Sequence, residues 1–333
     1  MTKSSRATIT DVARAAGVSL STVSRVMNGN ASVDAAMAER VRLVAAELGY
    51  SANPLARSLV LGRTQTIAVV IPDLANPTFQ AILRGLSRAA ADDGYHVLIA
   101  DSAEQVETER ALAETTRRRT DGVILCAPRL PAGELAELLP TLAPVVVVNR
   151  PPQESAPTVA ADYRTAMAEL VAHLYGLGHR RLVFLSGVVG SASGAARRAA
   201  LAEARTAHPD LEILELPSGV DFDSGAAAAD AVRATGATAV LAFNDLVAMG
   251  LLSAVAARGV RVPEDLSVVG FDDIPFARYT APPLTTAAVP AAELGRRAWD
   301  AMSALLAGDP APASSVLTPE VVVRASTAAP PAS

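Results

Sequence analysis

Residues 9–29 read ITDVARAAGVSLSTVSRVMNG, and this stretch decides the fold of the first part of the chain. Thr10 is a suitable N-cap for a first helix, and Gly17 can end that helix in the left-handed conformation. Ser19 can cap a second helix almost immediately afterwards. The apolar residues that helical spacing places on the inner faces are Val12, Ala13, Ala16, Val23 and Val26.

A longer third helix is predicted after these two short ones. Asp34 can cap it and Gly49 can stop it. Its expected buried stripe consists of Met37, Val41, Val44 and Leu48. Two short helices joined at a glycine and followed by a longer one are typical of a helix-turn-helix, whose second helix enters the DNA major groove. The alternative is a small helical bundle that has no partner.

The distribution of charge favours DNA binding. Residues 1–63 carry eight basic and four acidic side chains, although the whole 333-residue chain has a formal net charge of −5. A basic head on an acidic body is expected when only the head meets a polyanion. In the second helix, the Arg25 guanidinium could donate two parallel hydrogen bonds to guanine O6 and N7.

A short hinge is predicted over residues 53–63. Asn53 is a suitable N-cap, and Pro54 would occupy the first helical position, where its missing N–H costs nothing. The segment LARSLVL, residues 55–61, could form about two helical turns, which are marginal in water without support. The alternative is a plain flexible linker.

From Ile67 onward, short apolar runs alternate with alanine-rich stretches of helical character. Examples are IAVVIP at 67–72, GVILCAP at 122–128 and AVLAFN at 239–244. This alternation predicts an α/β fold with parallel sheets covered by helices on both faces. The number of runs exceeds one compact sheet, so we expect two lobes with a cleft at the carboxyl ends of the strands.

Several classes of site and location are not expected. No apolar run approaches the roughly 18–20 residues of a membrane span, and the N-terminus lacks a signal-peptide core, so a cytoplasmic protein without a membrane partner is expected. Cys126, the one cysteine, lies in an apolar run and is predicted to be a buried thiol. SGVVGSASG at 186–194 is not a dinucleotide-binding motif, and Asp272–Asp273 has no nearby histidine. We therefore predict no cofactor, no metal site and no catalytic residue.

Polar and aromatic side chains that follow the predicted strands are candidate ligand-binding residues. Carboxylates accept from ligand hydroxyls, an arginine donates to ligand oxygens, and an aromatic face covers an apolar ring. The set consists of Asn76, Thr78, Phe79, Asp162, Ser191, Ser193, Arg197, Asn244 and Asp272.

The sequence resembles the lactose-repressor (LacI/GalR) family of bacterial transcription regulators. The resemblance is dense over the first sixty residues, in ITDVARAAGVSLSTVSRVMNG and RVRLVAAELGYSANPLARSL. It continues through the body in IPDLANPTF, TDGVIL, LGHRRLVFLSG, FNDLVAMG and RVPEDLSVVGFDDI followed by PPLTT. The resemblance therefore covers almost the whole chain.

The resemblance implies roles for residues of the head and hinge. Leu20, Ser21 and Arg25 would read bases. Phosphate and helix-anchoring contacts would come from Ser19, Thr22, Ser24 and Asn28, with Ser32 near the backbone. Two hinge helices of a dimer would pair in the minor groove, where Leu59 would wedge between base pairs with Ala56 packed beside it. Thr10, Asn53 and Arg57 complete the expected DNA-binding set.

For the body, the resemblance implies a periplasmic sugar-binding fold. The expected division is a head at 1–52, a hinge at 53–63, a body at 64–329 and a disordered tail at 330–333. Within the body, the N-lobe would comprise about 64–161 and 291–318, and the C-lobe about 162–290 and 319–329. Asp272 and Arg197 match the family's effector pocket best. The chain departs from the family pattern at 199–201 and after LPSG, so either Phe222 or Val220 could line the pocket.

These observations predict a ligand-responsive regulator that represses genes for sugar or related carbon-source use. Its expected partners are double-stranded operator DNA, a second copy in a homodimer, and a sugar, sugar phosphate or nucleoside or purine. It would work in the cytoplasm at the nucleoid, and whether the ligand induces or corepresses is open. The alternatives are a solute-binding protein and an α/β enzyme that processes sugars or nucleosides. The C-terminal segment has no leucine heptad, so a tetramer formed by a C-terminal helical bundle is not expected.

Replacing the predicted wedge tests the hinge interpretation. The substitution Leu59→Ala should weaken operator binding and reduce DNA bending, because alanine is too short to separate stacked base pairs. The bend angle can be measured by gel mobility of circularly permuted operator fragments. An unchanged angle would count against the wedge.

Overall fold

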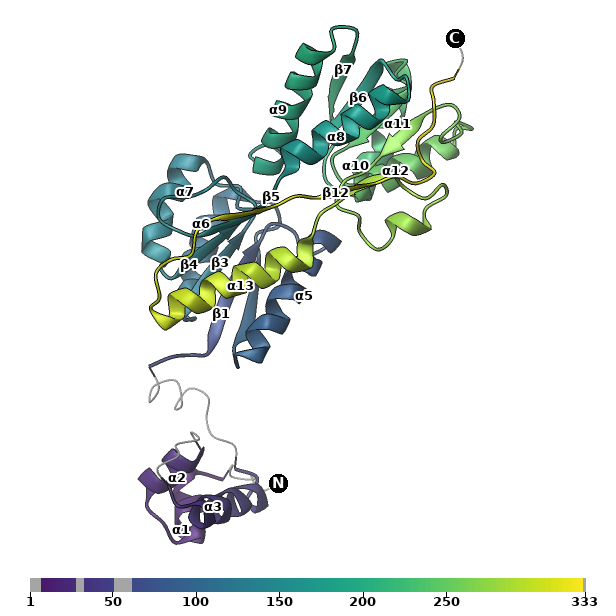
Figure 1. Cartoon of the computed structure of the whole chain (residues 1–333). Coiled ribbons are helices and arrows are strands. Elements are labelled where there is room, and N and C mark those ends of the chain that lie inside the picture. Colours follow the sequence, from purple (N-terminus) through teal and green to yellow (C-terminus); the bar gives the residue numbers. More distant parts are fainter. Residues whose placement is uncertain (1–6, 28–32, 51–61, 332–333) are drawn as a thin grey trace. The chain divides into compact units, whose positions relative to one another are not determined.

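The computed structural model describes residues 7–27, 33–50 and 62–331 (Figure 1). The chain divides into two compact units, 1–65 and 66–333. The first unit is called the head and the second the body.

The head contains the three predicted helices. They are α1 (Ile9–Ala16), α2 (Leu20–Met27) and α3 (Ala35–Glu47). Val12, Val23 and Val41, one from each helix, are fully buried and form the centre of the core. Gly17 ends α1 in the left-handed conformation, and the Asp34 carboxylate caps α3 by accepting from the Met37 N–H, as the sequence predicts.

The prediction that Thr10 caps α1 is wrong, because the cap is Thr8. Its hydroxyl accepts from the Asp11 N–H at 3.4 Å, while the Asp11 carboxylate accepts from the Thr8 N–H at 3.0 Å. This reciprocal capping box needs an acidic or amide side chain three residues after the cap. Thr10 is followed at that spacing by Ala13, which cannot return the hydrogen bond, so Thr10 lies exposed in the first turn.

The predicted stripe of α3 is also partly wrong. Met37 and Leu48 are 37% and 41% exposed, and Val44 is half-buried. The residues that pack into the core are Ala38, Val41 and Ala45. These alanines have no bulk to keep the helices apart, so α3 can approach its neighbours on this side and leaves the longer side chains at the edge.

The N-lobe of the body is built on a six-stranded parallel sheet in the order β11-β5-β4-β3-β1-β2. Its strands are β1 (Thr66–Ile71), β2 (His96–Asp101), β3 (Gly122–Cys126), β4 (Val145–Val148), β5 (Thr158–Ala161) and β11 (Ser315–Leu317). Its helices are α5 (Pro77–Asp92), α6 (Val106–Arg117), α7 (Ala132–Leu138), a short 3₁₀ turn at Leu139–Leu142, and α13 (Ala291–Ala307).

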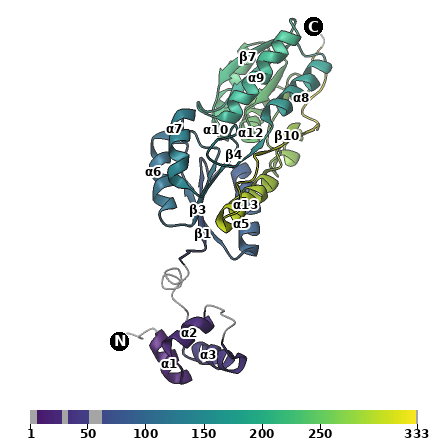
Figure 2. The ribbon, with the colours of Figure 1, turned by 60° about the vertical axis from the view of Figure 1, so that its left-hand side comes forward.

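Alternate residues of the N-lobe strands enter two different cores. In β1, Ile67 and Val69 pack toward α5 and α13, whereas Ala68 and Val70 pack toward α6 and α7. Figure 2 shows the two helix pairs on opposite faces of the sheet. The continuous apolar runs of the sequence therefore follow from burial of both faces.

The C-lobe repeats this plan on a four-stranded parallel sheet, β7-β6-β8-β9. Its strands are β6 (Arg181–Ser186), β7 (Glu212–Pro217), β8 (Ala239–Ala242) and β9 (Ser267–Val269). Its helices are α8 (Tyr163–Gly176), α9 (Ala192–Ala207), α10 (Phe222–Ala227), α11 (Ala229–Ala234) and α12 (Asp245–Ala256), with a 3₁₀ turn at Ala277–Tyr279. In β6, Leu182 and Phe184 face one core, and Val183 and Leu185 face the other.

The chain crosses between the lobes three times, after β5, after β10 (Thr286–Ala288) and after β11. The last crossing brings β12 (Glu320–Val322) antiparallel to β10. The predicted α/β architecture of two sheet-based lobes is thus present.

Two further predictions concern Cys126 and membrane spans. Cys126 is buried, as predicted, and burial raises the pKa of its thiol to about 12. No described helix has the length and apolarity to cross a membrane.

The packing of α5 against α13 depends on glycine. A Cβ at Gly85 would overlap the Ala292 carbonyl. We expect Gly85→Ala to lower the free energy of unfolding by about 1–3 kcal/mol, because the two helices would have to separate. The matched control is Gly133→Ala in α7, where no atom lies within 4 Å of the added Cβ and alanine should be neutral or slightly stabilising. Urea denaturation measures both, and equal midpoints for Gly85→Ala and the parent would contradict the close approach.

Candidate functional site

Helix α2 has one buried face and one exposed face in the head. Val23 and Val26 are buried, whereas Leu20, Ser21 and Arg25 are exposed, Leu20 to 49%. Arg14 and Arg42 pair with Asp11 and Glu39, but none of the ion pairs among the described residues involves Arg25. The guanidinium of Arg25 is thus presented outward next to an exposed apolar side chain.

A cluster of hydroxyls lies at the N-terminus of α2. Ser19 Oγ accepts from the Thr22 N–H at 3.1 Å and lies 2.8 Å from both Ser21 Oγ and Thr22 Oγ1. Hydroxyls and free N–H groups at a helix N-terminus suit phosphate oxygens. This surface can therefore hold a nucleic-acid backbone at one end while Arg25 reaches outward from the next turns.

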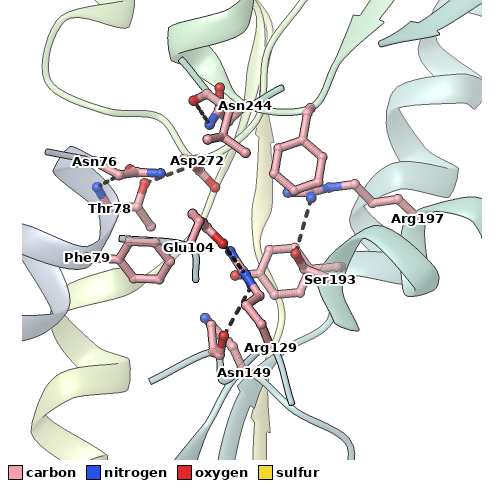
Figure 3. A pocket seen from close by; sticks show the side chains of 14 residues that line it. Asn76, Thr78, Phe79, Glu104, Arg129, Asn149, Ser193, Arg197, Asn244 and Asp272 are labelled. Atoms are coloured by element: carbon pink, nitrogen blue, oxygen red, sulfur yellow. Dashed lines mark hydrogen bonds and ion pairs between the residues drawn. The ribbon is translucent and has the colours of Figure 1, made fainter. Parts of the chain in front are cut away.

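A second site lies in the body, between the carboxyl ends of the strands of the two lobes (Figure 3). The space between the lining atoms is about 480 Å³ when the open solvent at the mouth is counted. Its lining consists of Asn76, Thr78, Phe79, Glu104, Ala127, Arg129, Asn149, Tyr163, Ser193, Arg197, Val220, Phe243, Asn244 and Asp272. We call this cavity the cleft.

Two contacts cross the cleft from one lobe to the other. Thr78 Oγ1, in the first turn of α5, donates to Asp272 Oδ2 of the C-lobe at 2.9 Å. Gly190, in the loop after β6, lies against the Arg129 carbonyl of the N-lobe, so that an added Cβ would be 3.1 Å from that oxygen. Opening the cleft would break both contacts.

Arg197 is a buried cation held mainly by aromatic rings. Its side chain is 2% exposed, and its guanidinium carbon lies 4.0 Å from the Phe271 ring centroid, 4.6 Å from Phe243 and 4.8 Å from Tyr163. Its Nε–H has no hydrogen-bond partner among the described residues. Burial lowers the pKa of Arg197, and the nearby Asp272 carboxylate opposes that shift. Arg197 can donate to a ligand oxygen without being drawn into a direct ion pair.

The loop that carries Asp272 is fixed by a fully buried carboxylate, that of Asp245. Asp245 Oδ2 accepts from the Ile274 N–H at 2.8 Å, and Oδ1 accepts from Thr286 Oγ1 at 2.6 Å. Asp273 pairs with Arg324 at 2.6 Å. Because burial outweighs these hydrogen bonds, the pKa of Asp245 lies well above its usual range, and burial raises the pKa of Asp272 to about 6.

Backbone strain is concentrated around the cleft. Four of its non-glycine lining residues have positive φ, which is uncommon for residues with a Cβ. They are Glu104, Ala127, Asn149 and Asp272. The first three follow β2, β3 and β4 in turn. Such strain persists only where the surrounding structure imposes it, and it gathers at binding sites.

Comparisons with known proteins match both parts of the chain. Residues 8–53 match the model of the bacterial regulatory proteins of the lacI family, and residues 171–327 match a periplasmic binding protein-like domain. The HTH-type transcriptional repressor CytR of Escherichia coli K12 is 34% identical over 98% of this chain and 97% of its own length. The chain belongs to the lacI family. The ribose operon repressor of the same organism is 32% identical over 89% of this chain and 92% of the repressor.

Solved structures of the lacI family agree with this assignment. A lac repressor dimer bound to operator and the anti-inducer ONPF superposes with a TM-score of 0.88 at 27% identity, over 98% of this chain and all of that chain. The complex of the regulator CelR with cellobiose superposes with a TM-score of 0.70 at 30% identity, over 96% of this chain and all of that chain. The head and the two-lobed body therefore follow the family's architecture.

Seven of the predicted ligand-binding residues line the cleft. They are Asn76, Thr78, Phe79, Ser193, Arg197, Asn244 and Asp272. Asp162 instead caps α8 by accepting from Thr165 and lines a neighbouring depression, while Ser191 is buried as the cap of α9. Phe222 is 45% exposed at the start of α10, and Val220 lines the cleft in its place. The Asn244 side chain holds the Val220 carbonyl at 2.8 Å, which turns this segment so that Val220 faces inward.

Six lining residues of the cleft are not among those predicted from the sequence: Glu104, Ala127, Arg129, Asn149, Tyr163 and Phe243. The signal was available, because Glu104, Arg129 and Asn149 follow β2, β3 and β4, and the rule that residues after strands form the site applies to them equally. Seven of the predicted DNA-binding residues lie in the described part of the head: Thr10, Ser19, Leu20, Ser21, Thr22, Ser24 and Arg25. Those outside the described residues are Asn28, Ser32, Asn53, Ala56, Arg57 and Leu59.

The described residues contain no group of three or more His, Cys, Asp or Glu side chains that could hold a metal ion. The adjacent carboxylates of Asp272 and Asp273 have separate partners, Thr78 and Arg324. Arg324 occupies the place beside Asp273 that a cation would take.

Titration of Asp272 should make stability pH-dependent. Because its pKa is raised to about 6, the protonated form is favoured in the folded state, and this contribution to stability is lost as pH rises from about 4 through 6. At pH 7, the free energy of unfolding of Asp272→Asn should therefore exceed that of the parent protein by on the order of 1–3 kcal/mol. Urea denaturation at several pH values measures the difference between the two proteins. A difference that is constant from pH 4 to pH 7 would show that Asp272 has no raised pKa.

Proposed function

We propose that this lacI-family protein is a dimeric repressor that binds a roughly palindromic operator and releases or grips it in response to a small molecule. The observation that carries this proposal is the exposed surface of α2, where Leu20, Ser21 and Arg25 project opposite the buried Val23 and Val26. A recognition helix needs this division, because its buried face fixes the angle at which the other face meets base edges.

In this proposal Arg25 reads a guanine and the hydroxyls around Ser19 hold phosphates. The fork of Arg25 matches guanine O6 and N7, whereas the hydroxyl cluster offers donors without regard to sequence. The relatives support the proposal, since CytR and the ribose operon repressor are named as repressors and the lac repressor structure contains operator. Residues 1–52 would serve as the DNA-binding head, 53–63 as the hinge and 64–329 as the effector-binding and dimerising body.

Exposed apolar side chains support dimerisation through the body. β2 is an edge strand, and its Leu98 and Ile99 are 39% and 44% exposed. In the C-lobe, Phe276 and Tyr279 are 53% and 81% exposed. Large apolar side chains at an unpaired sheet edge are costly in a monomer, and a second copy would cover them. The lac repressor in the matched structure is a dimer.

The cleft would hold the effector, which we propose to be a sugar, a sugar phosphate, a nucleoside or a purine. Asn76, Asn244 and Asp272 can accept from hydroxyls, Arg197 can donate, and Phe79 can cover a ring. A ligand that favours one spacing of the lobes over another would shift the equilibrium between hinge conformations. Such coupling between sites is usually worth about 1–3 kcal/mol. A protein with these partners would act in the cytoplasm at the nucleoid.

The proposal is tested by DNA selection followed by variants of α2. Operator sequences selected by the full-length protein should be bound by Arg25→Ala about 1–3 kcal/mol more weakly, with relaxed preference at one base position in each half-site. Fluorescence anisotropy on the selected operator and on single-base variants measures this. Arg42→Ala is the matched control, since Arg42 is an exposed head arginine on α3. An equal loss on every sequence for Arg25→Ala would contradict base reading.

A further inference from the structure

We infer that the cleft is built for an uncharged, hydroxylated ring compound, and that Glu104 sets this preference by neutralising Arg129. The inference rests on the proposed function of the cleft as the effector site and narrows the class of effector. It separates free sugars and nucleosides from their phosphate esters, which the same fold could equally accommodate.

The charges of the cleft are balanced before any ligand enters. Four of the residues that line the cleft have charged side chains, and they are two arginines and two acids. They are Arg129, Arg197, Glu104 and Asp272. Directly behind them, the buried Glu109 accepts from the N–H groups of Arg129 and Leu130. A phosphate ester would bring up to two further negative charges into this balanced set.

The guanidinium of Arg129 is already engaged by an acid. Its Nε donates to Glu104 Oε2 at 2.6 Å and its Nη2 donates to Glu104 Oε1 at 2.7 Å, while Nη1 donates to the Ala127 carbonyl at 3.2 Å. The fork formed by Nε and Nη2 is therefore occupied and cannot bind a phosphate bidentately. The N–H bonds that are left can donate singly, which is what ligand hydroxyls require.

Arg197 cannot take over the role of phosphate binder at low cost. Aromatic rings surround its guanidinium, and its charge is balanced by Asp272. Burial lowers the pKa of Arg197 and raises the pKa of Asp272, so the cleft disfavours charge of either sign. An ester dianion would lose its hydration in this environment, and the charge of Arg197, the lining cation without a direct ion pair, is already balanced by the nearby Asp272 carboxylate.

Side-chain caps already take up one N–H group at each of the helix N-termini around the cleft. Phosphates commonly bind the free N–H groups at such termini. Here the side chain of the N-cap residue already accepts from the first turn of each of four helices at the carboxyl ends of the strands. The bonds are Asn76 to Thr78 N in α5, Asp162 to Thr165 N in α8, Ser191 to Gly194 N in α9 and Asn244 to Val247 N in α12. The Asp162 carboxylate, which lines the neighbouring depression and not the cleft itself, would in addition repel an approaching anion.

Inorganic phosphate tests the role of Glu104 without knowledge of the natural ligand. In the full-length protein, Glu104→Gln keeps the side-chain shape but removes the charge that occupies Arg129. We expect Glu104→Gln to bind phosphate about tenfold or more tightly than the parent, by isothermal titration at constant ionic strength. Equal phosphate affinity in the two proteins would overturn the inference.

The matched control is Asp230→Asn. Asp230 engages Arg258 with the same fork, at 2.8 and 2.9 Å, and Arg258 also donates to a backbone carbonyl, but this pair lies on the surface, between α11 and the turn that follows α12. Freeing this surface arginine should leave phosphate affinity as in the parent. A gain equal to that of Glu104→Gln would show a non-specific effect of charge and would overturn the inference.

Matched pairs of compounds test the parent protein directly. Ribose with ribose 5-phosphate, glucose with glucose 6-phosphate, and adenosine with adenosine monophosphate are titrated against the protein. The uncharged member of any pair that binds should bind at least about tenfold more tightly, and Glu104→Gln should narrow that ratio. Tighter binding of an ester would overturn the inference while leaving the proposed function intact. If instead a bound compound leaves operator affinity unchanged, the proposed function fails and the charge preference stands.

Discussion

The carboxylate of Asp272 lies between the two lobes. Burial of this charge is unfavourable unless other groups donate hydrogen bonds to it and balance it, and several side chains around the cleft do so. Asp245 and Arg324 fix the loop on the C-lobe side, Thr78 donates from the N-lobe, and Arg197 supplies the balancing charge. Each of these groups is buried or half-buried, so each depends on the others for its hydrogen bonds or its charge balance. In the proposed function, a ligand that replaces Thr78 as the partner of Asp272 would change how firmly the lobes are joined.

In the proposed function, this dependence would couple ligand binding to the conformation of the body. The positive φ angles after β2, β3 and β4, and at Asp272, show that the strand ends are held in unfavourable conformations by their surroundings. Both sheets are covered by helices that pack tightly, as the close approach of Gly85 to Ala292 shows. Tight packing gives the rigidity that can sustain this strain. In the proposed function, each lobe would move as a unit, and a ligand would act on the few contacts between the lobes.

The head follows different physics. Its core consists of valines and alanines from three short helices, and so little buried apolar surface gives a small margin of stability. That is sufficient for an element whose task is to present α2. In the proposed function, the hydroxyls at one end of α2 and the outward Arg25 would combine sequence-independent and sequence-dependent contacts around a single helix of eight residues.

The sequence by itself determined the helix-turn-helix, the two parallel-sheet lobes and most of the cleft, because these depend on local caps, on runs of apolar residues and on the rule that strand ends form sites. It also placed Arg197 and Asp272 in one pocket through the family resemblance. Tertiary structure alone decided the rest. Helix packing turned α3 so that alanines rather than Met37 and Leu48 face inward, and the Asn244 side chain turned Val220 inward rather than Phe222. The ion pair of Glu104 with Arg129 joins residues 25 positions apart. Only the folded sheet brings these two side chains close enough for their charges to neutralise each other.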